Sequence, residues 1–146
     1  MDRAIGATHD ESPPYKLFST GQAAAVSFLG SFLATGLLMA SNYSRVGKSS
    51  AARLSVVGGM LATLAIMVLA YLLPDGTPSS VFVIVTLVAA RGAADSLQGP
   101  LLEEHGAQGG QVESGWKAFA VGLGACALAL GMVVALAMGA AFFTGF

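Results

Sequence analysis

The chain has 146 residues, of which seven are Lys or Arg and eight are Asp or Glu, so 10% are charged while 55% are hydrophobic. An ordinary soluble domain carries about 25% charged residues, which it needs to cover the large surface that a chain of this size exposes. The composition argues against a soluble enzyme domain and a disordered chain, and the net charge of −1 argues against a nucleic-acid-binding protein. It indicates an integral membrane protein.

Long apolar segments predict transmembrane helices. A helix needs about 20 apolar residues to cross the ~30 Å hydrocarbon core of a bilayer. Three windows without any charge meet this length: between Lys16 and Arg45, from Leu54 to Leu73, and from Ala118 to Phe146. Ser19, with Gln22 three residues later, is typical of a capping box at a helix start. We therefore expect a polar tail at 1–16 and spans at about 20–41, 54–73 and 116–142.

A further segment, 81–90, has only ten apolar residues before Arg91. Its β-branched run would suit a buried strand, but a lone strand in a bilayer leaves its backbone groups unpaired. Thr77 and Pro78 instead suit the start of a helix, and Pro100 is expected to end it. The sequence therefore predicts another span at about 78–98.

The distribution of cations favours four crossings. With four spans, the loops 41–53 and 91–117 hold five cations on one side: Arg45, Lys48, Arg53, Arg91 and Lys117. The opposite side holds only Arg3 and Lys16. Because positive loops stay in the cytoplasm, both termini are expected outside, in the inner or plasma membrane. The expected fold is an all-α membrane protein whose residues 17–146 form a compact bundle of four transmembrane helices.

Small residues recur every four positions within the expected spans. Such stripes are typical of close helix packing in membranes. They comprise Ser27 and Ser31 in the first span, Gly58 and Ala62 in the second, and Gly131, Ala135 and Gly139 in the last. The stripes either pack the bundle internally or form the interface of a homo-oligomer, and the sequence leaves both interpretations open.

One group of ionisable residues falls inside an expected span. Arg91, Asp95 and Gln98 follow i, i+4, i+7 spacing and so share a helix face. Arg91 would lie about 20 Å along the helix from Pro78, where an unpaired charge is costly, so we expect it to pair with Asp95. The group is either a polar site lining a cytoplasm-facing cavity or an ion pair that orients the end of the helix.

The segment 101–105 between Pro100 and Gly106 is expected to form a short interfacial helix. Glu103, Glu104 and His105 are metal-ligand types, but adjacent helical residues point in different directions, so no metal site is predicted. We expect the two glutamates to pair with the basic loop, and His105 to belong to the candidate polar site. Aromatic and basic side chains near the ends of spans are typical interfacial anchors, namely Tyr43, Trp116 and Lys117.

No catalytic constellation is apparent. Proton relays, ion-coupled transporters and intramembrane proteases need acids, bases or activated nucleophiles at membrane depth, and the three charge-free windows contain none. The sequence therefore predicts a non-enzymatic accessory or interaction protein, without cofactors, whose partners are the bilayer and either itself or another membrane protein. The alternatives are a small channel or transporter subunit that uses the candidate polar site and, more distantly, an immunity-type membrane protein.

The stretch Gly21–Gly47, with a GQ, an FLG, an LL and an NY along a hydrophobic helix, resembles a pattern in small bacterial inner-membrane proteins. The later segments Asp95–Gly99 and Ser114–Phe119, with His105 between them, resemble further parts of that pattern. The resemblance implies a multi-span membrane protein but no particular activity. It draws attention to Asn42 and Tyr43 in addition to the candidate polar site.

Overall fold

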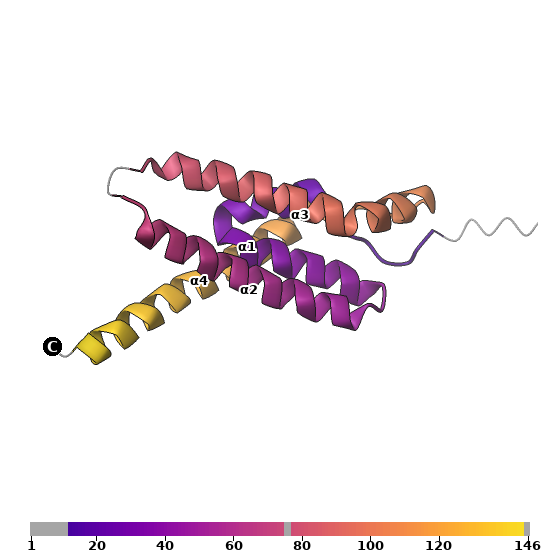
Figure 1. The fold of residues 1–146 in the computed structure, drawn as a ribbon. Coiled ribbons are helices and arrows are strands. Elements are labelled where there is room, and N and C mark those ends of the chain that lie inside the picture. Colours follow the sequence, from indigo (N-terminus) through magenta and orange to yellow (C-terminus); the bar gives the residue numbers. More distant parts are fainter. Residues whose placement is uncertain (1–11, 75–76, 145–146) are drawn as a thin grey trace, which may run out of the picture.

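The computed structural model describes residues 12–74 and 77–144, with the side chains of residues 30, 31, 143 and 144 excepted. The chain forms α1 (Thr20–Arg45), α2 (Ser49–Leu72), α3 (Ser79–Ala107) and α4 (Gly115–Thr144) (Figure 1). Within the described residues the only β-type pairing is an isolated bridge between Leu17 and Val112. The predicted all-helical class is confirmed.

Polar side chains mark the starts of α1 and α4. Gln22 N–H donates to Ser19 Oγ over 3.1 Å, and Ser19 N–H donates to Gln22 Oε1 over 2.9 Å, which confirms the capping box. At α4, Trp116 N–H donates to Ser114 Oγ over 3.3 Å. These bonds satisfy backbone donors that the first turn of a helix otherwise leaves unpaired.

Although its backbone is helical throughout, α1 reverses direction near its middle. Thr35 Oγ1 donates to the Ala23 carbonyl over 2.9 Å, and Asn42 Nδ2 donates to the Phe18 carbonyl over 2.8 Å. In a straight helix these residues would be roughly 18 Å and 36 Å apart. Figure 1 shows the helix doubling back, so that its two ends lie close together.

The reversal falls at about residues 29–32, where the sequence places Gly30 beside Ser31. Gly/Ser pairs are among the few causes of sharp helix kinks. Leu33 N–H, immediately after the reversal, donates to Thr63 Oγ1 of α2 over 3.0 Å. A hydroxyl from a neighbouring helix thus caps the second arm of the hairpin.

The α1 hairpin is the centre of the fold. All extensive interhelical contacts among the described residues involve α1, which packs against α2, α3 and α4 in turn. The core consists of residues from both arms and from the first half of α4: Phe18, Val26, Leu33, Ala34, Leu38, Ala118 and Ala125. The second half of α4 projects away from the other helices (Figure 1).

Glycines allow the closest helix crossing, between the second arm of α1 and α2. A Cβ added at Gly36 would lie 2.5 Å from the Ser55 carbonyl oxygen, and one added at Gly59 would lie 2.7 Å from the Phe32 carbonyl oxygen. The two backbones therefore pack at a separation that no side chain allows. The face of α2 that meets α1 carries Gly59 and Thr63, rather than the predicted pair Gly58 and Ala62.

Among the residues that the structure describes, three helices, α2, α3 and α4, are long and apolar enough to cross a membrane. Only 11% to 17% of the residues in their most apolar windows are buried within the molecule. The expectation of four spanning helices is wrong for α1, because its reversal brings Thr35 back to Ala23 and Asn42 back to Phe18. Its length and apolar character suited a span, but each arm after the reversal has roughly half its residues and is too short for a 30 Å core.

The predicted break at Pro100 is also wrong, because α3 continues through this proline to Ala107 and no separate interfacial helix follows. A proline removes one backbone hydrogen bond and bends a helix, and the last turns of α3 run at an angle to the rest in Figure 1.

The segment 41–53 is not an open loop, since only Val46–Lys48 separates α1 from α2, with Gly47 at a φ of 76°. Thr77 is not the helix cap either, because α3 begins after Pro78.

Candidate functional site

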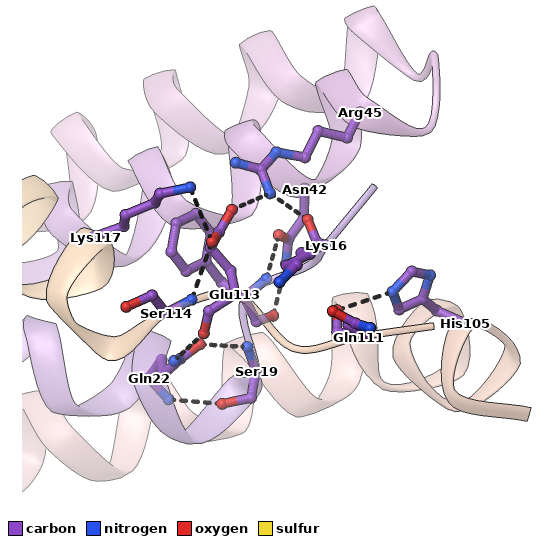
Figure 2. A network of polar contacts seen from close by, with 11 residues as sticks. Lys16, Ser19, Gln22, Asn42, Arg45, His105, Gln111, Glu113, Ser114 and Lys117 are labelled. Carbon is purple, nitrogen blue, oxygen red and sulfur yellow. Dashed lines mark hydrogen bonds and ion pairs between the residues drawn. The ribbon is translucent and has the colours of Figure 1, made fainter. Parts of the chain in front are cut away.

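The carboxylate of Glu113 is the centre of a polar network at the end of the molecule where α1 begins and ends (Figure 2). It accepts hydrogen bonds from Arg45 Nη1 at 2.9 Å, Lys117 Nζ at 3.1 Å and Ser114 N–H at 3.0 Å. The side chain is only 6% exposed. The Ser114 N–H, followed by Lys117 and Arg45, lowers the pKa of Glu113 from 4.5 to about 2.

The same network ties the chain segments that enter α1 and α4. Glu113 N–H donates to the Leu17 carbonyl over 2.8 Å, and Leu17 N–H donates to the Gln111 carbonyl over 3.2 Å. Gln22 Nε2 donates to the Glu113 carbonyl over 2.8 Å, and Arg45 Nη1 also donates to the Lys16 carbonyl. Both arms of α1 and the start of α4 are thereby held together.

A second cluster, buried beside the first, joins the two arms of α1 to α3. Asn42, 1% exposed, accepts from Phe18 N–H over 2.8 Å and donates to Gln98 Oε1 over 3.0 Å. Gln98, 2% exposed, donates in turn to the Met39 carbonyl over 2.9 Å. Each amide is bonded within the protein, so this cluster fixes the hairpin against α3.

The predicted ion pair between Arg91 and Asp95 is present, with Nε and Oδ2 2.8 Å apart. Its side chains are 55% and 48% exposed, whereas Gln98 is turned into the protein against Asn42. The predicted three-residue polar face is therefore divided between an exposed ion pair and a buried amide cluster. Asp95 lies with Thr20 in the wall of one cavity.

His105 is the last residue of the candidate polar site, and it lies apart from the Arg91–Asp95 pair. It is 6% exposed, its ring stacks on that of Tyr15 at a centroid distance of 5.3 Å, and Gly110 lies against it. Its Nε2 is 3.2 Å from the Gln111 carbonyl oxygen. Its buried Nδ1 has no hydrogen-bond partner among the described residues.

The predicted small residues of α1, α2 and α4 differ in their burial and in what they contact. Ser27 is buried and its hydroxyl donates to the Ala24 carbonyl over 2.6 Å, while the side chain of Ser31 lies outside the described residues. Gly58 and Ala62 line a groove rather than a helix contact. On α4, Ala135 is exposed, and a Cβ added at Gly131 or Gly139 meets no atom of the described residues within 4 Å.

The predicted anchors also make specific contacts. The Tyr43 hydroxyl donates to the Leu97 carbonyl over 2.6 Å, and Lys117 belongs to the Glu113 network. Trp116 is 79% exposed and meets Phe119 edge to face at 5.8 Å. The expected pairing of Glu103 and Glu104 with the basic loop is absent from the described ion pairs, because Arg45 binds Glu113 instead.

Three of the cavities among the described residues are formed by residues at or near the site. An apolar groove of about 300 Å³ runs between α1, α2 and α3, with Phe32, Gly36, Met39, Leu54, Gly58 and Leu97 in its wall. The Asp95 cavity, about 320 Å³, is lined by Ser19, Thr20, Asp95, Glu103 and His105, among others. The Lys48 cavity, about 210 Å³, is lined by Tyr15, Val46, Lys48, Leu101, Glu104, His105 and Gln108.

Sequence reasoning missed Glu113, the most connected residue of the site. Its sequence signals are its position before the helix cap Ser114 and its i, i+4 spacing to Lys117. The bond to Arg45 depends on the reversal of α1, which no local pattern shows. Within residues 12–74 and 77–144, no group of three His, Cys, Asp or Glu side chains could hold a metal ion.

No family model, curated protein or solved structure matches the chain. The resemblance of Gly21–Gly47 to small bacterial inner-membrane proteins therefore stays a prediction.

Proposed function

We propose that the protein is a non-enzymatic integral membrane protein of the inner or plasma membrane, with three crossing helices around a re-entrant α1 hairpin. Each of α2, α3 and α4 is long enough to cross and leaves most of its apolar surface uncovered. Non-spanning helix ends at membrane depth are tolerated when they are buried in protein. The second arm of the α1 hairpin is largely buried and the first arm partly buried, and α1 packs against each of the other three helices.

In this topology the cations support a single orientation. With α1 entering and leaving on one side, that side holds the six Lys and Arg of the described residues, and Arg3 precedes α1 in the sequence. The short connection between α2 and α3 and the end of α4 carry none. The bias becomes seven to none, compared with five to two for four crossings. We therefore place the N-terminus in the cytoplasm and the C-terminus outside.

Reporter fusions test this orientation. Both topologies place fusions after residues 47, 76, 110 and 146 inside, outside, inside and outside, so only the N-terminus separates them. A reporter fused before Ser12 is expected to read inside, whereas four crossings require it to read outside. An outside reading at the N-terminus, with the other four unchanged, would refute the re-entrant hairpin.

The role that the geometry supports best is binding of a partner in the plane of the membrane. One observation carries this proposal: the polar side chains at the site bind one another, whereas broad apolar faces stay open. The second half of α4 carries one such face, and a second copy of the chain or another membrane protein would cover it. The channel alternative has less support, since Gln98 does not line a cavity with Arg91 and Asp95.

Cysteine cross-linking in native membranes tests this role. The chain has one cysteine, Cys126, which is exposed on α4. In a Cys126→Ser background, Gly131→Cys and Gly139→Cys are expected to form cross-linked species, whether homodimer or adduct. Val133→Cys, on another face of α4, is the matched control. Equal yields at all three positions, or no adduct at any, would refute a specific interface on this face.

A further inference from the structure

The apolar groove offers no free polar group to an occupant. The hydroxyls in its wall are bonded within the protein: Tyr43 to the Leu97 carbonyl at 2.6 Å, Ser55 to the Ala51 carbonyl at 2.9 Å, and Thr35 to the Ala23 carbonyl at 2.9 Å. Gly58 lies in the wall with open space above it. An occupant of this groove is therefore a hydrocarbon chain.

The Lys48 cavity lies about one helical turn beyond the groove. Three parts of the chain each give one residue to the groove and another, three or four positions away, to the cavity: Tyr43 and Val46 at the end of α1, Ala51 and Lys48 at the start of α2, and Leu97 and Leu101 on α3. Residues three or four apart on a helix lie on the same face. The two hollows share no lining residue but lie end to end, the groove apolar along the helices and the cavity polar at the end of the molecule.

The polar end presents a cation and a carboxylate. Lys48 forms no ion pair among the described residues, and Glu104 has only a long contact, 3.4 Å, with Gln108. Both side chains line the cavity, together with His105, whose Nε2 lies 3.2 Å from the Gln111 carbonyl oxygen.

These groups match a zwitterionic headgroup that has N–H donors. A phosphate suits the ammonium of Lys48, and a primary ammonium suits the carboxylate of Glu104. We propose that the groove and the Lys48 cavity together bind one phosphatidylethanolamine molecule, with an acyl chain in the groove and its headgroup in the cavity. The proposal rests on the proposed membrane placement, with this end at the cytoplasmic surface.

Lipid binding is measured by native mass spectrometry of the full-length protein in detergent. The protein is offered phosphatidylethanolamine, phosphatidylcholine and phosphatidylglycerol with identical acyl chains. Phosphatidylcholine has the same charges but no N–H, so retention of phosphatidylethanolamine is expected to exceed it by at least about tenfold, as for one hydrogen bond between charged groups. Equal retention of these two lipids, or preferential retention of phosphatidylglycerol, would overturn the proposal.

Paired variants locate the site. Glu104→Gln is expected to abolish the preference for phosphatidylethanolamine over phosphatidylcholine, and Lys48→Gln to weaken retention of both. The matched controls are Glu103→Gln and Arg53→Gln, which change the same charges outside the Lys48 cavity. Control variants that reduce retention as much as Glu104→Gln and Lys48→Gln would show that net charge, rather than this cavity, attracts the lipid.

A steric variant tests the groove without disturbing the helix contacts. Gly58→Leu fills open space in the groove, and Gly124→Leu makes the same change on an open face of α4. Retention of every lipid is expected to fall at least about tenfold in Gly58→Leu and to stay unchanged in Gly124→Leu, at equal helix content. Wild-type retention by Gly58→Leu would overturn the groove assignment. Detergent measurements do not depend on orientation, so a failure here is distinct from a failure of the topology.

Discussion

Two adjacent glycines of α2, Gly58 and Gly59, give a sharp test of how the helices pack. A Cβ at Gly59 would lie 2.7 Å from the Phe32 carbonyl oxygen, 3.2 Å from Gly36 Cα and 3.3 Å from Leu33 Cα. All three are backbone atoms of α1, so no side chain can rotate away. A Cβ at Gly58 meets nothing within 4 Å.

The two Gly→Ala changes are expected to have opposite effects on the free energy of unfolding. Either Gly→Ala change gains up to about 1 kcal/mol of helix propensity. At Gly59 the added methyl forces α1 and α2 apart, and overpacking of this kind costs about 1–3 kcal/mol. Gly59→Ala is therefore expected to be about 1–3 kcal/mol less stable than Gly58→Ala, which should match or exceed the wild type.

The free energy of unfolding of the two variants is compared in detergent, by titration with a denaturing detergent under reversible conditions. Helix content before unfolding serves as the control that both variants are folded. Equal stability of the two variants, or a more stable Gly59→Ala, would refute the close crossing of α1 and α2.

Two further predictions concern the polar clusters. Asn42→Ala leaves the Phe18 backbone and Gln98 Oε1 without these partners and is expected to lower the free energy of unfolding by about 1–3 kcal/mol. A double-mutant cycle with Gln98→Ala should give a coupling of about 0.6 kcal/mol, typical of membrane helices, and a coupling of zero would contradict the contact. Because the pKa of Glu113 is lowered in the folded state, its stabilisation is complete above about pH 4.5 and is lost as the pH falls towards 2. Glu113→Gln should therefore be less stable than the wild type at pH 7, with the difference shrinking between pH 4.5 and 2. A constant difference across that range would contradict the role of the carboxylate.

The helices themselves were largely predictable from local signals. The apolar windows, the Ser19–Gln22 capping box and the i, i+4 pairing of Arg91 with Asp95 depend on residues that are close in sequence, and all appear in the structure. Hydropathy gives the length of an apolar segment, but it does not show whether the helix runs straight or reverses. The first segment was therefore interpreted as a crossing, although Gly30 and Ser31 stood at its centre.

The candidate site was less predictable because its contacts join residues distant in sequence. Asn42 meets Phe18 and Gln98, and Arg45 meets Glu113, only after α1 has reversed. Pro100 was expected to end α3, but helix boundaries depend on what the following turns contact, and His105 is buried beyond it. Tertiary packing overrode the local signal in both cases.

The central position of the α1 hairpin has a consequence for biogenesis. The α1 hairpin has polar groups with partners in later parts of the chain: Thr63 for the Leu33 N–H, Gln98 for Asn42 and Glu113 for Arg45. These contacts can form only after α2 and α3 have been synthesised and the chain has reached the start of α4. Although α1 is translated before the other three helices, it is therefore among the last of the four to complete its contacts.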